Sequence, residues 1–108
     1  MLEVNERDIR LSYGDKLHIT FQFNGYELAP DDLVSFSVKR TAIGPELLER
    51  NYKGLSGNLL KVFIQSGDMA KLPVGNSYYD IHVIRPDGNK ITLMYPAKLQ
   101  IIGVVHDV

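Results

Sequence analysis

The segment that decides the fold is LPVGNSYYDIHVIRPDGNK, residues 72–90. It opens on a Pro–Gly turn, continues through residues 78–85 with alternating apolar and polar side chains, and ends in Pro-Asp-Gly. Alternation with a period of two predicts a half-buried β-strand. The Pro-Asp-Gly sequence predicts a tight hairpin, because Gly88 adopts positive φ without steric cost. One face of this strand holds Tyr79, Ile81 and Val83, and the other holds Tyr78, Asp80, His82 and Ile84.

The same alternation recurs along the chain. In KLHITFQF, residues 16–23, the apolar side chains fall on one face and the polar ones on the other. Further runs are LVSFSVKR (33–40), NLLKVFIQ (58–65), KITLMY (90–95) and KLQIIGVV (98–105), with turn signals that include Asn24-Gly25 and Tyr95-Pro96. Short strands at such spacing predict an all-β fold, an antiparallel immunoglobulin-like β-sandwich of about seven to eight strands. Residues 1–108 are expected to form a single domain.

Two segments are less clear. PELLERNYKG, residues 45–54, fits a short helix that begins at Pro45, or an edge strand or loop in which Leu48, Arg50 and Tyr52 alternate. We favour the strand or loop. SGDMAKLP, residues 66–73, predicts one helical turn capped by Ser66 or Asp68.

Composition narrows the classes of function. The chain has 108 residues, 44% of them hydrophobic and 23% charged, with a net charge of -1 and no cysteine. Such a balance is ordinary for a small soluble domain and gives no basic surface for nucleic acid. The charged N-terminus is not a signal peptide, and no apolar run reaches the ~18 residues of a membrane span. We therefore expect an intracellular protein without nucleic-acid or membrane partners.

No set of residues has the spacing of a catalytic or metal site. His18, His82 and His106 lack a ligand motif, since metal sites need three or four convergent ligands. Asp31 and Asp32 belong to a turn sequence, in which aspartate accepts hydrogen bonds from its own backbone. Asp80 lies within a strand and needs solvent or a cation; Lys90 and Arg85 have the required charge. The sequence thus predicts no enzyme, no metal and no cofactor.

The tyrosines have two interpretations. Tyrosines such as Tyr26 and Tyr52 could form a platform that stacks on sugar rings, although carbohydrate modules rely mainly on tryptophan, which is absent. The other interpretation is structural. In immunoglobulin-like sandwiches a tyrosine near the start of a late strand bonds a backbone group a few residues upstream. The residues expected at this corner are Leu72, Gly75, Tyr78 and Tyr79.

Apolar residues on both sides of some strands predict an interface. A sandwich covers only one face of each sheet, so extra apolar residues on an outer face mark a contact surface. The residues predicted to contribute to one such surface are Phe63, Ile84 and Met94.

The order of motifs resembles a known family. Gly14-Asp15 precedes an alternating strand, residues 34–39 read V-x-F-x-V-K, and residues 72–83 carry an L-x-x-G-x-x-Y-Y-D-I-x-V pattern before the hairpin. This order resembles the N-terminal β-sandwich domain of upper baseplate proteins of tailed phages of Gram-positive bacteria, and of related prophage virion proteins. The resemblance extends from about residue 8 to about residue 105.

The resemblance implies a non-enzymatic virion component, assembled in the host cytoplasm, that forms a homo-oligomer and contacts other phage tail or baseplate proteins. The chain departs from the family in two ways. Family members continue into a linker and a C-terminal region that holds the receptor-binding protein, whereas this sequence ends at Val108. Pro96 also occupies a position where the family often has glycine. The alternative, suggested by the tyrosines, is a module that binds carbohydrate or a cell surface.

Overall fold

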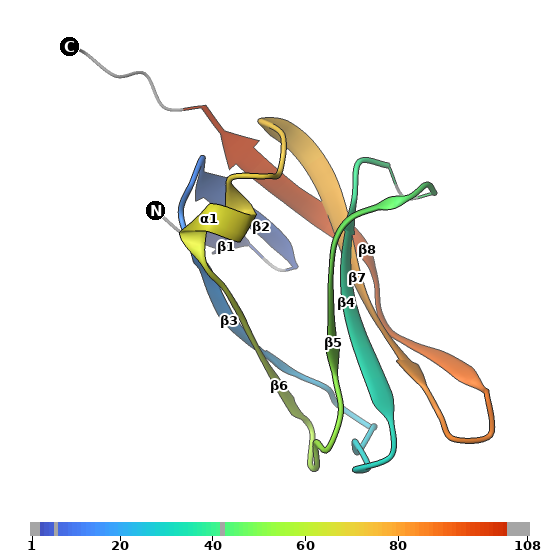
Figure 1. The fold of residues 1–108 in the computed structure, drawn as a ribbon. Helices are drawn as coiled ribbons and strands as arrows, with labels where there is room; N and C mark the ends of the chain where they lie inside the picture. The colour runs from blue at the N-terminus through green and yellow to red at the C-terminus, as the bar shows by residue number, and fades with distance from the viewer. Residues whose placement is uncertain (1–2, 6, 42, 104–108) are drawn as a thin grey trace.

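The computed structural model describes residues 3–5, 7–41 and 43–103, which form an all-β fold with one short helix. Six strands make a large sheet in the order β1-β2-β8-β7-β4-β5, and two make a small sheet, β3-β6 (Figure 1). In chain order the elements are β1 (Glu3–Asn5), β2 (Asp8–Ser12), β3 (Leu17–Gln22), β4 (Leu33–Lys39), β5 (Glu46–Tyr52), β6 (Leu59–Ile64), α1 (Ser66–Met69), β7 (Gly75–Ile84) and β8 (Lys90–Ile102).

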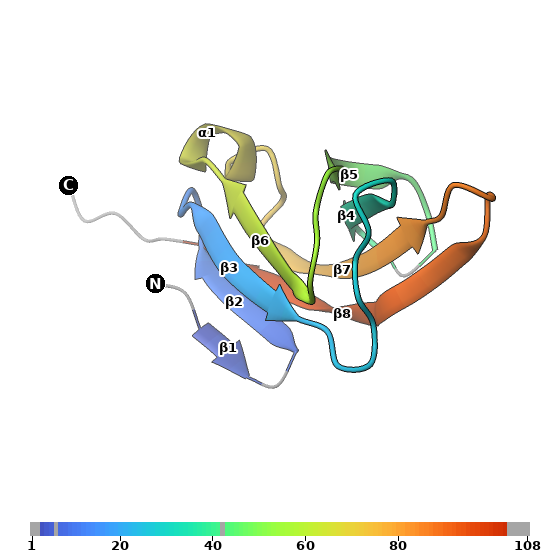
Figure 2. The same ribbon diagram turned by 90° about the horizontal axis from the view of Figure 1, so that it is seen from below.

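The two sheets form unequal layers. Viewed from below, the large sheet curves around the small one, and α1 lies beyond one end of β6 (Figure 2). The predicted all-β class is confirmed, and so is the preference for a strand or loop over a helix in the ambiguous segment, because residues 46–52 form β5. Leu48, Arg50 and Tyr52 are the half-buried members of that strand, as their alternation predicted.

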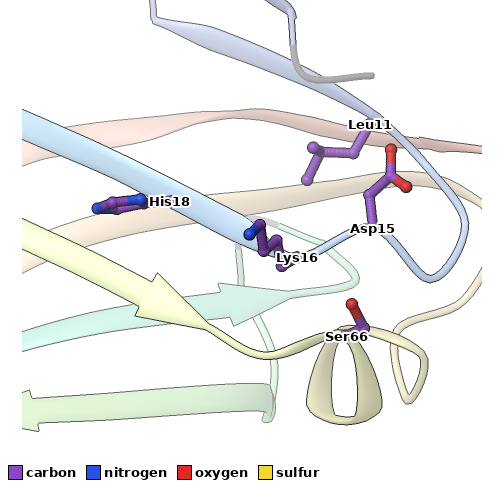
Figure 3. Close-up of a pocket in the computed structure, with 5 residues that line it drawn as sticks. All are labelled: Leu11, Asp15, Lys16, His18 and Ser66. Atoms are coloured by element: carbon purple, nitrogen blue, oxygen red, sulfur yellow. The ribbon is translucent and has the colours of Figure 1, made fainter.

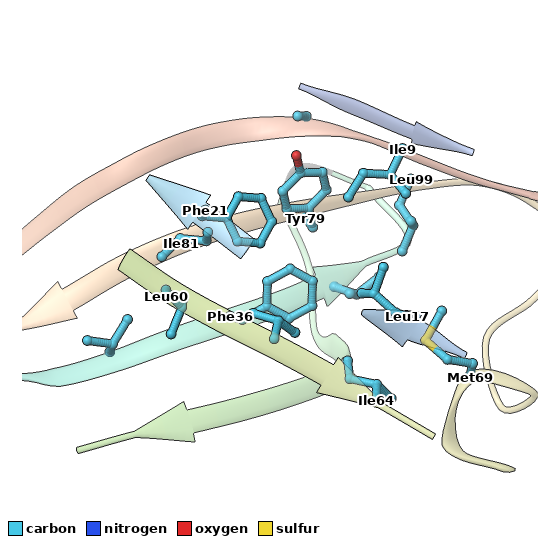
Figure 4. Packing of buried hydrophobic residues seen from close by; sticks show 14 of the residues in the cluster. Ile9, Leu17, Phe21, Phe36, Leu60, Ile64, Met69, Tyr79, Ile81 and Leu99 are labelled. Atoms are coloured by element: carbon cyan, nitrogen blue, oxygen red, sulfur yellow. The ribbon is translucent and has the colours of Figure 1, made fainter. Parts of the chain in front are cut away.

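The core lies between the inner faces of the sheets. Alternate residues of β3 and β6, such as Leu17 and Val62, are fully buried and pack against alternate residues of β4, β7 and β8. Three aromatic rings meet at the centre: Phe21 of β3, Phe36 of β4 and Tyr79 of β7 (Figure 4). Their centroids are separated by 5.6 to 6.2 Å, within the range of favourable aromatic contacts.

One strand pair departs from the predicted antiparallel sheet. β2 and β8 are parallel, with Ile9 opposite Leu99 and Leu11 opposite Ile101. The other pairs of the large sheet are antiparallel. A hairpin forces neighbouring strands to run in opposite directions, but β2 and β8 lie at opposite ends of the sequence and no such turn constrains them.

The predicted turn at Tyr95-Pro96 is wrong, because β8 runs unbroken through it. Ala97 lies opposite Tyr79 and Met94 lies opposite Ile81, so β8 has one residue more than β7 across this interval. Such a bulge leaves a residue out of the hydrogen-bond ladder, and a proline without an N–H is tolerated there. β8 ends at Ile102, so the predicted strand does not include Gly103; residues 104 and 105 of that prediction lie outside the described residues.

The two shorter turns behave differently. The Pro-Asp-Gly hairpin is confirmed: the Arg85 N–H bonds the Asn89 carbonyl at 2.8 Å, and Gly88 has a φ of 90°. The single helical turn at residues 66–69 is also confirmed, but its predicted cap is wrong. Gln65 occupies the N-cap position and makes no side-chain capping bond.

The predicted corner is partly buried and is held differently from the prediction. Leu72 is buried, Gly75 has a φ of 110°, and Tyr78 and Tyr79 point to opposite sides of β7. Tyr79 is the buried one, and its hydroxyl donates to the Arg7 carbonyl before β2. The acceptor is thus near the other end of the chain and not a few residues upstream. Burial raises the pKa of Tyr79 to about 12, and the charge of Asp8 contributes.

Replacing Tyr79 with phenylalanine should destabilise the protein by about 1 kcal/mol, because one buried hydrogen bond is lost while the packed ring stays. Urea unfolding would measure the difference. The matched control is Tyr78→Phe, which alters the neighbouring ring on the outer face and should change stability less. Equal stability of Tyr79→Phe and the unmodified protein would contradict a structural role for the bond to Arg7.

Candidate functional site

The outer face of the small sheet presents exposed apolar side chains. Phe63 and Leu59 of β6 are 49% and 46% exposed. Phe63 lies opposite His18 of β3, and the two rings meet edge to face with centroids 5.3 Å apart. Lys61 stands between the two apolar residues, opposite Thr20. We call Leu59, Lys61, Phe63 and His18 the small-sheet surface.

A solvent-open cavity of about 550 Å³ adjoins this surface. It lies where the turn between β2 and β3 approaches the start of α1. The Tyr13 hydroxyl joins this turn to the other end of α1 by a 3.0 Å bond to the Ala70 carbonyl. His18 belongs both to the cavity and to the small-sheet surface, so the two are continuous. The lining residues are Leu11, Asp15, Lys16, His18 and Ser66 (Figure 3). A mixed polar lining that is open to solvent fits contact with a macromolecule better than enclosure of a small ligand.

The structure does not bring the three predicted interface residues together. Phe63 lies on the outer face of the small sheet, and Ile84, which is 37% exposed, lies on the outer face of the large sheet. Met94 is half-buried opposite Ile81 and packs against the core. A single surface formed by all three is therefore incorrect, because the outer faces of the two sheets point in opposite directions. A partner contact at Phe63 or at Ile84 stays a prediction.

The two histidines that the structure describes are also separated. His18 is on the outer face of β3, and His82 is on the outer face of β7, on the other side of the sandwich. His106 lies outside the described residues. Among residues 3–5, 7–41 and 43–103, no three histidine or acidic side chains are grouped as metal ligands would be.

A polar cluster occupies the outer face of the large sheet. Ser35 lies opposite His82 and Ser37 opposite Asp80. On the other side of β4, the Ser35 hydroxyl bonds Asn51 Oδ1 at 2.7 Å. Ser37 is 1% exposed, and its hydroxyl has no hydrogen-bond partner within the described part of the chain.

Asp80 pairs with a cation that sequence reasoning did not select. Its Oδ2 lies 4.0 Å from Lys39 Nζ on the neighbouring strand. Lys39 lies opposite Tyr78, two residues from Asp80, so the pair is diagonal across β4 and β7. The candidates Arg85 and Lys90 were wrong because both lie at the far end of β7, beyond His82. The register of β4 against β7 was the missing information.

His82 is the titratable group of this cluster with an altered pKa. Burial lowers the pKa of His82, and the positive charge of Lys90 lowers it further, with a smaller effect from Lys39. The negative charges of Asp80 and Glu49 act in the opposite direction without reversing the shift. The folded protein therefore favours the neutral imidazole.

This shift predicts the sign of a pH effect. Below the ordinary histidine pKa of 6.5 the unfolded chain binds a proton that folded His82 resists. Its contribution to stability is therefore complete above that value and is lost as the pH falls through the folded pKa. The unfolding free energy should fall more between about pH 7.5 and about pH 5 in the unmodified protein than in His82→Gln. Parallel pH profiles for the two proteins would rule out the effect.

A second polar cluster closes one end of the sandwich. Asp32, which is 0% exposed, accepts a 3.1 Å bond from the Tyr26 hydroxyl and a 3.0 Å bond from the Ala29 N–H. Arg85 Nε lies 3.4 Å from Asp32 Oδ1, and Arg85 Nη1 donates to the Tyr26 hydroxyl at 3.2 Å. The guanidinium also stacks over the Tyr26 ring, 5.9 Å from its centroid. Burial and the neighbouring Asp32 raise the pKa of Tyr26.

This cluster joins the loop before β4 to the hairpin after β7, so its role is structural. The predicted turn role of Asp32 is confirmed by the bond from Ala29. Neither tyrosine suggested for sugar stacking is a free platform: Tyr26 is covered by Arg85, and Tyr52 packs half-buried against the core. The sequence signal that was missed is the lone arginine, Arg85, at the start of the hairpin. Its partner, Asp32, lies 53 residues earlier in the chain (85 minus 32).

Removing Arg85 should be costly because Asp32 would stay buried without a cation. We expect Arg85→Met to destabilise the protein by about 2 kcal/mol at neutral pH, less than for a fully buried pair because Arg85 is 40% exposed. Asp32→Asn in the same chain should restore part of this loss. A double-mutant cycle by urea unfolding measures the coupling, and additive effects of the two changes would exclude an energetic pairing.

Comparisons with known proteins found no match, either to protein-family models, to curated proteins or to solved structures. None of the helical segments in the described ranges is long and apolar enough to span a membrane.

Proposed function

We propose that this protein is a non-enzymatic structural module of a phage or prophage virion, a baseplate or tail accessory protein that acts by docking onto other proteins. The observation that carries the docking role is the small-sheet surface. Two large apolar side chains, Phe63 and Leu59, stand about half exposed on the outer face of a sheet. Aromatic and aliphatic side chains on such a face are typical anchors of protein interfaces. The virion assignment rests on the resemblance of the sequence motifs.

The finer fold assignment belongs to the same proposal. The sheet order β8-β7-β4-β5 against β3-β6 corresponds to strands G, F, C and C′ against B and E of an immunoglobulin-like sandwich. The Tyr79 hydroxyl departs from this pattern by bonding Arg7. We therefore propose an immunoglobulin-like arrangement in which an N-terminal segment takes over the bond that usually fixes the corner.

A binding role also accounts for the polar groups. Asp32 accepts hydrogen bonds from Tyr26 and Ala29 and forms an ion pair with Arg85. Asp80 pairs with Lys39, and His82 is held towards its neutral form. These contacts engage the acidic side chains in packing and ion pairs within the fold. Catalysis would instead require such groups to converge on a substrate.

A second candidate is the binding of a carbohydrate. The specific observation in its favour is the polar cluster on the large sheet, where half-buried Tyr78 lies two residues from Asp80. Sugar hydroxyls bond such groups, and a tyrosine ring can stack on the sugar. Binding on a glycan array that is lost in Asp80→Ala would favour this candidate.

Docking is tested by co-expressing the chain with the tail proteins encoded by flanking genes. A tail protein should copurify in fixed stoichiometry, or light scattering should show a homo-oligomer. Phe63→Ser and Leu59→Ser should each weaken the association by at least about tenfold, as expected for an interface anchor.

The matched control is Leu47→Ser, which removes an exposed apolar side chain from the outer face of β5 in the large sheet and should leave the association unchanged. Each variant is checked for an unchanged unfolding midpoint. A strict monomer at high concentration that retains no tail protein would contradict the proposed function.

A further inference from the structure

The composition of β6 is unusual for a strand at the edge of a sheet. Its six residues, LLKVFI, include a single charged residue, Lys61, and neither proline nor glycine. Exposed edges normally carry charges, proline or bulges, because unpaired backbone groups recruit other strands. Edge strand β5 has such devices: its pairing with β4 shifts register between Val38 and Lys39, and the Arg50 guanidinium bonds the Glu49 carbonyl. β6 pairs with β3 without a register shift.

The register defines which backbone groups of β6 are open. The Phe23 N–H bonds the Asn58 carbonyl at 2.8 Å, and these two residues continue the register of β3 and β6. Hydrogen-bonded pairs alternate along an antiparallel ladder. Residues 60, 62 and 64 therefore bond β3, whereas the N–H and C=O groups of Leu59, Lys61 and Phe63 point away from it.

The open edge of β6 faces β5. Figures 1 and 2 both place β6, and not β3, on the side of the small sheet nearer β5. The inner-face residues Leu48 and Tyr52 of β5, together with Leu55, are only half-buried there, although they pack against the core. The small sheet is too narrow to cover them.

Both ends of this edge are bounded by contacts. Beyond Ile64, Arg50 of β5 reaches Asp68 of α1, with Nη2 and Oδ2 2.7 Å apart. Before Leu59, the Gly54 N–H bonds the Pro30 carbonyl at 3.0 Å. An added strand would therefore match the length of β6, which is six residues.

We propose that the open edge of β6 binds an extended segment of a partner protein, which adds a third strand to the small sheet between β6 and β5. In constant-type immunoglobulin domains strand D lies beside strand E, the position that is unfilled beside β6 here. The inference deepens the proposed docking function and rests on it, since it names the backbone contact through which a partner is held.

The chemistry of the site specifies the segment. Its inward side chains are apolar where they meet Leu48, Tyr52 and Leu55. Arg50 lies on the same face between Leu48 and Tyr52, and its charge is already paired with Asp68. An outward acidic residue pairs with Lys61, the one charge on β6, for which no ion pair occurs within the described residues. A second copy of β6 is a poorer occupant, because the symmetric register that aligns Leu59 with Phe63 places Lys61 against Lys61.

The test uses a synthetic nine-residue peptide in which threonine and valine alternate. An aspartate replaces the central threonine, so that it lies on the outward face with the other threonines. Residue-resolved amide exchange by NMR is recorded with and without it. We expect the peptide to slow exchange at residues 59, 61 and 63, with residues 60, 62 and 64 already slow in the free protein. Protection at residues 18, 20 and 22 of β3 instead, or at none of these positions, would overturn the proposal, as would protection of 59, 61 and 63 by self-association without peptide.

Proline variants separate the backbone contact from the side chains. Lys61→Pro removes an N–H that faces the edge and should weaken peptide binding by at least about tenfold. Lys61→Thr keeps the N–H and should weaken it less. Thr20→Pro, the matched change at the open edge of β3, should leave binding unchanged. Equal binding by Lys61→Pro and Lys61→Thr, with residues 60, 62 and 64 still protected, would contradict pairing at β6.

A charge exchange tests the site without proline. Lys61→Glu should lose affinity for the aspartate peptide and gain affinity for the same peptide with lysine at its centre, and no change in preference would refute the assigned role of Lys61. Phe63→Ser separates the two proposals, because it keeps the residue 63 N–H. It should still bind the peptide while losing tail-protein association. Failure of the peptide with intact Phe63-dependent association would overturn only the strand addition.

Discussion

The contact among Phe21, Phe36 and Tyr79 positions the two sheets. Phe21 is the only one of the three on the small sheet, and its ring lies 6.2 Å from Phe36 and 5.8 Å from Tyr79. Each ring is at least about nine-tenths buried, so the contact excludes water from the centre of the sandwich and fixes how β3 lies over β4 and β7. The Tyr79 hydroxyl extends the same contact to the Arg7 carbonyl, which ties the start of β2 to β7 within the large sheet.

With the sheets positioned in this way, their unequal width leaves part of the large sheet's inner face uncovered. A six-stranded sheet is covered by two strands and a single helical turn. The covering sheet therefore has open edges, and Leu48 and Tyr52 on the inner face of β5 are left half-buried. A two-stranded sheet is only marginally stable by itself, so a partner that widens it would gain both backbone hydrogen bonds and apolar contact. The open edge of β6 and the half-buried inner face of β5 both follow from this imbalance.

Sequence patterns predicted the elements better than their pairing. The alternation in residues 16–23 and 78–85 identified the buried faces of β3 and β7, because a strand that is buried on one face has apolar residues at every second position. The parallel pairing of β2 with β8 was not predictable, since it joins residues such as Ile9 and Leu99 from opposite ends of the chain. Pro96 suggested a turn because the bulge that accommodates it depends on the opposing strand.

For the candidate site residues too, local roles were predicted from the sequence and roles that depend on distant contacts were not. The turn role of Asp32 was local and was predicted, whereas its buried pairing with Arg85 depends on how two distant loops meet. Phe63 was recognised as an outward apolar residue from alternation, but the sequence did not indicate that Ile84 points in the opposite direction, because that depends on which sheet each strand joins. No known family matches the chain, so these assignments rest on its contacts, burial and strand register.

Residue-resolved amide exchange of the free protein most directly tests whether β6 is an open edge. Slow exchange is expected at residues 60, 62 and 64, which bond β3, and fast exchange at residues 59, 61 and 63, comparable with that of residues 18, 20 and 22 on the opposite edge of the small sheet. Uniform protection across residues 59–64 in a monomer would contradict this, because it would mean that the chain itself covers the edge.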